Sequence, residues 1–366
     1  GYVKLSQFSA NTTRDLTNAI HDQLKGSGGK LEGLVLDLRG NPGGLLEQAI
    51  QVSDVFLSEG VIVKTVGGGD KQRINEVKEA TSESTDLTAL PLVVIVNNSS
   101  ASASEIVAGA LKNNGRALVI GRQTFGKGSV QVLHDFNEPG RQSEEAALKL
   151  TIAQYLTPGD VSIQEVGITP DVLLLPGRAL KEQVNYFAPP RSMGEADLDG
   201  HLSNPVSKVQ EQARAEKRRR VEKAPLELRY LLDEKEDEVA KALRREGRAD
   251  AAAAHGDLEL TPEQQEDEEA DADPDRLVED YQIRFARELL KRAPFPDRAR
   301  LLEGAKALVA ERRQQEEARL ETRLKDLGVD WAAAAAQGTP KATVTVTPPS
   351  SRDFKAGETV QWTVSV

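Results

Sequence analysis

A serine cluster and one isolated lysine are the residues of this sequence best suited to covalent chemistry. Ser102 stands in the small-residue run SSASASEIVAG, and Lys127 lies between two glycines in TFGKGSVQ. A lysine flanked by glycines adds little to a helix or a core, and the missing Cβ atoms let other backbone approach closely. A serine hydroxyl beside a neutral lysine amine can act as nucleophile and base, provided that apolar surroundings keep the amine uncharged.

Ser102 also has a purely structural interpretation. Ser102 and Glu105 have the spacing of a capping box, in which the serine hydroxyl and the glutamate carboxylate bind backbone N–H groups at the start of a helix. A helix N-terminus, however, also presents free N–H groups that suit a developing oxyanion. The serine alone therefore does not decide between a cap and a nucleophile.

The lysine has a second interpretation as well. Gly121–Lys127 matches the first seven positions of a phosphate-binding loop, but that motif requires Ser or Thr next and then a helix. Here Gly128 comes next, and Ser129–Leu133 favours a strand. No G-x-S-x-G elbow is present, and His134 is the only histidine near these runs, so lysine is the base available to Ser102.

Composition excludes several other classes of function. The net charge of −11 argues against general binding to nucleic acid or anionic membranes. The absence of cysteine rules out disulfides, thiolate zinc sites and a cysteine nucleophile, and the four histidines lack metal-ligand spacing. No stretch approaches the roughly 18 apolar residues of a membrane span. The sequence predicts no metal and no cofactor.

Residues 1–178 alternate apolar runs, helical patterns and glycine-rich turns, which predicts a layered α/β core. Leu34–Leu38 and Leu92–Val96 are apolar runs typical of buried strands. Gly67–Ala89 is polar and glycine-rich, which predicts a loop. Further strands are predicted at Tyr2–Phe8, Val61–Val66, Ala117–Ile120, Ser129–Leu133 and Ala147–Tyr155, and helices at Asn11–Leu24, over Leu46–Phe56 and after Ser102.

The sequence becomes strongly charged after position 178. The segment 179–262 reads as a charged helical extension, with Val206–Gly247 the most helix-prone part, and 263–275 as an acidic disordered linker. The segment 276–338 predicts a helical hairpin or long helices, with starts at Asp273–Pro274 and Asp297. The segment 339–366 contains alternating runs at Ala342–Thr347 and Thr359–Val366, which predict the first strands of a truncated β-sandwich-like module.

Four blocks within positions 1–175 resemble the tail-specific, or carboxyl-terminal processing, family of serine peptidases. They are LVLDLRGNPGG, SASASEIVAGAL, TFGKGSVQ and LKLTIAQYLTPGDVSIQEVGITPD, in that order. The resemblance implies a crotonase- or ClpP-like layered α/β peptidase core. It makes Ser102 the nucleophile, Lys127 the general base and Gln131 the residue that orients the lysine. It also implies an oxyanion hole made of the Ala103 N–H and a glycine N–H of Gly43–Gly44.

The resemblance further implies an endopeptidase that cuts proteins or peptides near exposed C-termini through an acyl-enzyme, without metal or nucleotide. It predicts a PDZ domain upstream of Gly1 and a location in the bacterial periplasm or cell envelope. A catalytically silent scaffold on the same fold is the main alternative, and an NTPase is a distant one.

Overall fold

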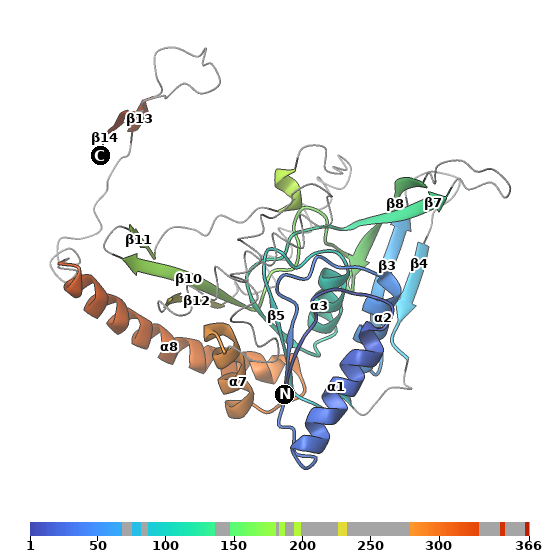
Figure 1. Ribbon diagram of the computed structural model, residues 1–366, viewed down its shortest axis with the longest axis horizontal. Coiled ribbons are helices and arrows are strands. Elements are labelled where there is room, and N and C mark those ends of the chain that lie inside the picture. The colour runs from blue at the N-terminus through green and yellow to red at the C-terminus, as the bar shows by residue number, and fades with distance from the viewer. Residues whose placement is uncertain are drawn as a thin grey trace, which may run out of the picture.

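The computed structural model describes residues 1–67, 75–81, 87–135, 147–180, 183–186, 194–198, 226–232, 279–328, 345–347 and 363–365. Its centre is a sheet of seven described strands in the order β1-β2-β5-β6-β10-β11, with β12 also paired to β10 (Figure 1). All pairings are parallel except that of β11 with β10. The strands are β1 (Tyr2–Lys4), β2 (Leu34–Asp37), β5 (Leu92–Val96), β6 (Leu118–Gly121), β10 (Val172–Leu180), β11 (Gln183–Asn185) and β12 (Leu226–Leu231).

A second, antiparallel sheet has the order β4-β3-β8-β7, with β9 paired to β8. Helix α3 (Ala103–Asn113) contacts β3 and β8 of this sheet as well as β6 of the parallel sheet. Every residue of α3 from Ala103 to Lys112 is buried, which explains its small and apolar sequence. The strands are β3 (Val61–Gly67), β4 (Asn75–Glu79), β7 (Ser129–Asp135), β8 (Ala147–Thr157) and β9 (Val161–Ser162).

The two faces of the parallel sheet enter two different hydrophobic clusters. In β5, Val94 and Val96 pack with helices α1 (Thr12–Gly26), α2 (Leu46–Phe56) and α3. Val93 and Ile95 belong to the other cluster, together with residues of α7 (Tyr281–Arg292) and α8 (Arg298–Asp326). In Figure 1, α7 and α8 lie on the other side of β5 from α1, α2 and α3. Successive strand residues alternate between faces, so the all-apolar run of β5 follows from burial on both sides.

Polar contacts join the C-terminal helices to the first part of the chain. The Asp171 carboxylate accepts hydrogen bonds from Arg298, one of them at 2.5 Å, and from the Val119 N–H at 3.0 Å. Arg116 donates to the carbonyl oxygens of Phe56, Leu87, Leu90 and Pro296. Burial lowers the pKa of Arg116 to about 10, because its partners are carbonyl groups rather than carboxylates.

Most of the elements predicted between positions 1 and 178 are confirmed, and so is the layered α/β class. Two predictions are wrong. Gly67–Ala89 contains strand β4, whose polar residues form an edge paired to β3. The segment 179–262, predicted as a charged helical extension, contains strands β11 and β12. Strand β12 lies in its most helix-prone part, Val206–Gly247, and there Leu228 and Tyr230 alternate onto the buried face. Period-two alternation, with strand pairing to β10, outweighs helix propensity there.

The C-terminal predictions have mixed outcomes. Helix α8 begins after an Asp297 cap, as predicted, but α7 begins after Asp280, and Glu279 and Asp280 are not helical. The predicted start at Asp273–Pro274 and the acidic linker 263–275 lie outside the described residues. Strands β13 (Thr345–Thr347) and β14 (Thr363–Ser365) pair antiparallel within the two segments predicted as strands. The η2 turn (Glu195–Asp197) has no counterpart among the sequence predictions. No described helix is long and apolar enough to cross a membrane.

We expect Leu289→Ala to lower the free energy of unfolding by about 2–5 kcal/mol, because Leu289 is fully buried between α7 and the parallel sheet. Lys291→Ala, at an exposed position on the same helix, is the matched control. It should change the free energy of unfolding by less than about 1 kcal/mol, because the exposed Lys291 contributes only its charge in the last turn of α7. Urea unfolding followed by far-UV circular dichroism measures both. Equal, small effects of the two substitutions would show that α7 does not complete the core.

Candidate active site

Ser102 occupies a strained position where the loop after β5 meets α3. Its backbone φ is 53°, in the left-handed region. A residue with a Cβ adopts such a conformation at a cost of about 1–3 kcal/mol. The preceding residues are held firmly: Ser100 Oγ donates to the Leu38 carbonyl at 2.8 Å, and the Ala101 N–H donates to the Asn41 carbonyl at 3.0 Å. Surrounding structure thus imposes the conformation that presents Ser102.

The carboxylate of Glu105 binds both Ser102 and the loop of residues 124–128, which carries Lys127 and is here named the lysine loop. Oε2 accepts the backbone N–H groups of both Ser102 and Lys127, each at 2.9 Å. Oε1 accepts the Thr124 hydroxyl at 2.5 Å and the Gly126 N–H at 2.7 Å. Since Ser102 and Lys127 bind the same oxygen atom, one side chain fixes the backbone of both candidate residues.

Glu105 is fully buried, and burial raises its pKa to about 7 despite the four hydrogen bonds, which favour the ionised form. An ionised carboxylate accepts all four donors, whereas a protonated one must use an oxygen as a donor. The hydrogen bond from the Ser102 N–H to Glu105 is the glutamate half of the predicted capping box. Three further donors, all from the lysine loop, go beyond what a capping residue requires.

The turn after β2 lies directly against Ser102. A Cβ on Gly43 would lie 2.9 Å from the Ser102 Cβ and 2.9 Å from the Ala101 carbonyl oxygen. The turn is fixed to the serine segment by Asn41, whose carbonyl also accepts the Ser104 hydroxyl at 3.0 Å. Gly43 has a φ of 105°. This positive φ and the close approach explain the glycine.

Three backbone N–H groups are predicted as oxyanion donors, and the structure distinguishes among them. The Gly43 N–H already donates to Asn41 Oδ1 at 2.9 Å. The N–H groups of Ala103 and Gly44 donate to no acceptor within the described part of the chain. Gly44 cannot carry a side chain, because a Cβ there would lie 2.2 Å from the Phe8 carbonyl oxygen.

The glycines beside Lys127 allow close backbone packing. A Cβ on Gly128 would lie 2.6 Å from the Gln164 backbone nitrogen, and one on Gly126 would lie 3.0 Å from the Glu165 carbonyl carbon. The Gly128 N–H donates to Gln164 Oε1 at 3.0 Å. The lysine is followed by strand β7 rather than a helix, so the phosphate-binding-loop interpretation is wrong.

Ser102 and Lys127 are thus brought to one carboxylate, and both residues are partly exposed. Gln131 is exposed, and its Nε2 donates to Thr151 Oγ1 at 3.4 Å; within the described residues no hydrogen bond joins its side chain to Lys127. Among the residues described, no cluster of His, Asp and Glu could hold a metal ion.

Sequence reasoning misses several residues of this site. The sequence pattern identifies Glu105 only as a capping residue and Thr124 only as part of a block. Glu195 carries no signal, although its N–H donates to the Phe125 carbonyl at 2.8 Å and its carboxylate accepts the Gln164 amide at 3.4 Å. For Glu105 the available signal is a glutamate in an otherwise small and apolar helix, a position where an acidic residue is rarely buried without partners.

Comparison with known proteins agrees with the resemblance found in the sequence. The pattern of peptidase family S41 matches residues 1–174. A carboxy-terminal-processing protease of Bartonella bacilliformis is 48% identical over 204 residues, covering 55% of this chain and 44% of that protein. A carboxyl-terminal-processing protease of Synechocystis sp. is 44% identical over 171 residues, covering 47% of this chain and 37% of that protein.

Among solved structures, a photosystem II D1 C-terminal processing protease is 39% identical, covers 47% of this chain and 42% of that chain, and superposes with a TM-score of 0.41. The chain therefore spans less than half the length of these relatives.

We expect the stability of the wild-type chain, relative to Glu105→Gln, to depend on pH. The pKa of Glu105 is raised from 4.5 to about 7, so its protonated form stabilises the fold fully below pH 4.5, and this contribution is lost as the pH rises through 7. The free energy of unfolding of the wild-type chain minus that of Glu105→Gln should fall by roughly 3 kcal/mol as the pH rises from 4.5 to above 7. Chemical denaturation at a series of pH values measures it, and parallel pH curves would contradict the prediction.

Gly43→Ala should destabilise the chain by about 1–3 kcal/mol more than Gly40→Ala. Both glycines have positive φ, so both substitutions strain the backbone, but a Cβ on Gly40 meets nothing within 4 Å. The difference in free energy of unfolding therefore measures the contact between the turn and Ser102. Equal losses of stability in the two variants would show that the cost comes from the positive φ alone and not from the contact with Ser102.

Proposed function

We propose that the chain carries a serine endopeptidase centre with Ser102 as nucleophile and Lys127 as general base, starting from the match of residues 1–174 to peptidase family S41. One observation carries the proposal: Glu105 Oε2 accepts the backbone N–H groups of both residues, at 2.9 Å each. A nucleophile and its base must keep a fixed separation, and a shared buried acceptor supplies that constraint.

In the proposed reaction, the neutral Lys127 amine takes the proton of the Ser102 hydroxyl while the serine oxygen bonds to the carbonyl carbon of the scissile peptide. The resulting tetrahedral intermediate collapses with loss of the amine product, which receives the proton from Lys127 and leaves an acyl-Ser102 ester. Water, deprotonated by the same lysine, then attacks the ester, and the lysine returns this proton to the Ser102 oxygen as the acid product leaves. This sequence uses only Ser102, Lys127 and water.

We assign the oxyanion hole to the N–H groups of Ala103 and Gly44. Both are free of acceptors among the described residues, whereas the Gly43 N–H is bonded to Asn41. Ala103 is the first residue of α3, so the positive end of the helix dipole adds to its hydrogen bond. This assignment narrows the predicted glycine pair to Gly44.

The role of Gln131 in orienting the lysine stays a prediction, because its amide is bonded to Thr151. We propose protein or peptide substrates cut near their C-termini, on the strength of the names of the relatives. The upstream PDZ domain and the periplasmic or envelope location likewise remain predictions from the resemblance. A non-catalytic scaffold is disfavoured by the strained Ser102 backbone, since a scaffold has no need of that strain.

We expect Ser102→Ala and Lys127→Ala each to lower kcat/KM by at least about a thousandfold while leaving the unfolding midpoint unchanged. Cleavage of an unstructured polypeptide, with products identified by mass spectrometry, measures the rate. A serine-reactive fluorophosphonate should label the wild-type chain and fail to label Ser102→Ala.

Ser99→Ala and Lys25→Ala are the matched controls, because both residues are exposed and neither has a role in the proposed reaction. Both controls should retain wild-type cleavage. Undiminished cleavage by Ser102→Ala would overturn the assignment of the nucleophile, and undiminished cleavage by Lys127→Ala that of the base.

A further inference from the structure

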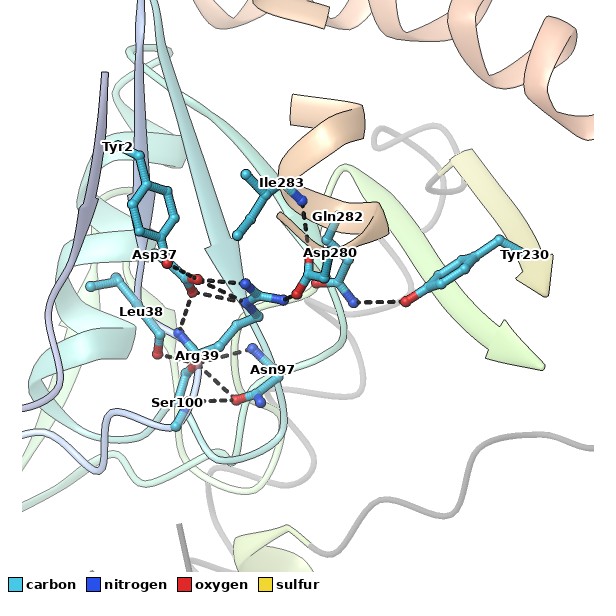
Figure 2. A network of polar contacts seen from close by, with 11 residues as sticks. Tyr2, Asp37, Leu38, Arg39, Asn97, Ser100, Tyr230, Asp280, Gln282 and Ile283 are labelled. Carbon is cyan, nitrogen blue, oxygen red and sulfur yellow. Dashed lines mark hydrogen bonds and ion pairs between the residues drawn. The ribbon is translucent and has the colours of Figure 1, made fainter. Parts of the chain in front are cut away.

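Arg39 lies between two carboxylates that come from distant parts of the chain (Figure 2). Its Nε donates to both oxygens of Asp37, at 2.9 and 3.0 Å, and Nη2 donates to Asp37 Oδ2 at 2.6 Å. Its Nη1 donates to Asp280 Oδ2, which belongs to the residue that caps α7. A single guanidinium therefore ties the end of β2 to a helix outside the part of the chain that matches family S41.

The three charged groups are well shielded from water. The exposed fractions of the side chains are 15% for Arg39, 1% for Asp37 and 20% for Asp280. Burial lowers the pKa of Arg39, but the two carboxylates raise it by more, so its pKa lies above the ordinary value. Removing one carboxylate from such a group weakens a charge-assisted bond that solvent replaces poorly.

Arg39 directly precedes the turn that carries the proposed oxyanion donor. Its own N–H donates to Asp37 Oδ1 at 2.9 Å, and the next N–H, that of Gly40, donates to Asn97 Oδ1 at 3.1 Å. Asn97 begins the loop that ends at Ser102, and its side chain also accepts the Ser99 N–H at 3.1 Å. The network in Figure 2 thus reaches both segments that meet at the nucleophile.

The two oxygens of Asp280 have separate tasks. Oδ1 accepts the Ile283 N–H at 2.9 Å and so caps α7, while Oδ2 accepts the Arg39 guanidinium. An asparagine could keep the cap through its oxygen. Its NH₂ group would then face Arg39, setting donor against donor, so the ion pair would be lost while the helix cap was kept.

We propose that Asp280 is a positioning residue for the peptidase reaction, acting through Arg39 on the Gly40–Gly44 turn. The inference rests on the proposed function, and it adds to the catalytic site a helix from outside the S41 match. Asp280 has no role in binding substrate in this scheme. Its loss displaces the oxyanion donor relative to Ser102, which slows the chemical step and leaves substrate binding largely intact.

The test compares Asp280→Asn with Asp297→Asn in the full chain. Asp297 is the matched control, because its Oδ1 caps α8 through the Arg300 N–H at 3.0 Å and its other oxygen pairs with an exposed arginine, Arg300. We expect Asp280→Asn to lower kcat by about ten- to a hundredfold with KM changed less than about twofold. Asp297→Asn should leave both constants unchanged. Rates are compared at a temperature where circular dichroism shows both variants fully folded, because loss of the shielded ion pair lowers the melting temperature of Asp280→Asn.

Hydrogen exchange of the Gly40–Gly44 amides gives a second readout that does not depend on activity. Exchange should accelerate in Asp280→Asn and stay at the wild-type rate in Asp297→Asn. Cleavage by the parent chain that does not depend on Ser102 would overturn the proposed function. If cleavage by the parent chain depends on Ser102, the proposed function stands. An unchanged kcat and unchanged exchange in Asp280→Asn would then overturn only the positioning role of Asp280.

Discussion

The buried carboxylate of Glu105 is the constraint on which the candidate site depends. A charge on a fully buried glutamate is costly unless hydrogen bonds replace water, and here four donors do so, from the start of α3 and from the lysine loop. Burial nevertheless raises the pKa to about 7, so the group lies close to the balance between its two protonation states near neutral pH. The separation of Ser102 and Lys127 therefore follows from satisfying one carboxylate.

The two-sided burial of the parallel sheet explains how residues far along the chain come to support this site. Val93 and Ile95 face away from α1–α3, and without a covering layer their apolar side chains would be exposed to water. Helices α7 and α8 cover that face, and β12 extends the same sheet beside β10. The contacts of Arg298 with Asp171 and of Asp280 with Arg39 join the same two helices to the first part of the chain. The second hydrophobic cluster thus draws its members from both sides of the boundary predicted at position 178.

Local sequence patterns correctly predict most of the helices and strands before position 178. The apolar runs of β2 and β5, the helix start at Ser102 and the glycines around Lys127 each have a local physical cause, so pattern and structure agree. Strand β12 escapes prediction because its charged surroundings favour a helix, and its pairing partner β10 lies far upstream in the sequence. Local sequence patterns also do not predict that the backbones of Ser102 and Lys127 both bind Glu105, because the bond from the Lys127 N–H is long-range. The role of Gln131 rests on the resemblance alone and stays a prediction, because the hydrogen bond from its Nε2 to Thr151 gives no information on its carbonyl oxygen.

The strained backbone of Ser102 is maintained by contacts from other parts of the fold as well as from α3. A positive φ at a serine costs about 1–3 kcal/mol, and the conformation persists only where neighbouring contacts determine it. Those contacts come from the carbonyls of Leu38 and Asn41 and from the Glu105 carboxylate. Leu38 and Asn41 flank Arg39, whose guanidinium is bound by Asp37 and Asp280. The geometry of one serine is therefore determined jointly by a strand, a turn and a helix, and the helix comes from a region that the match to family S41 does not reach.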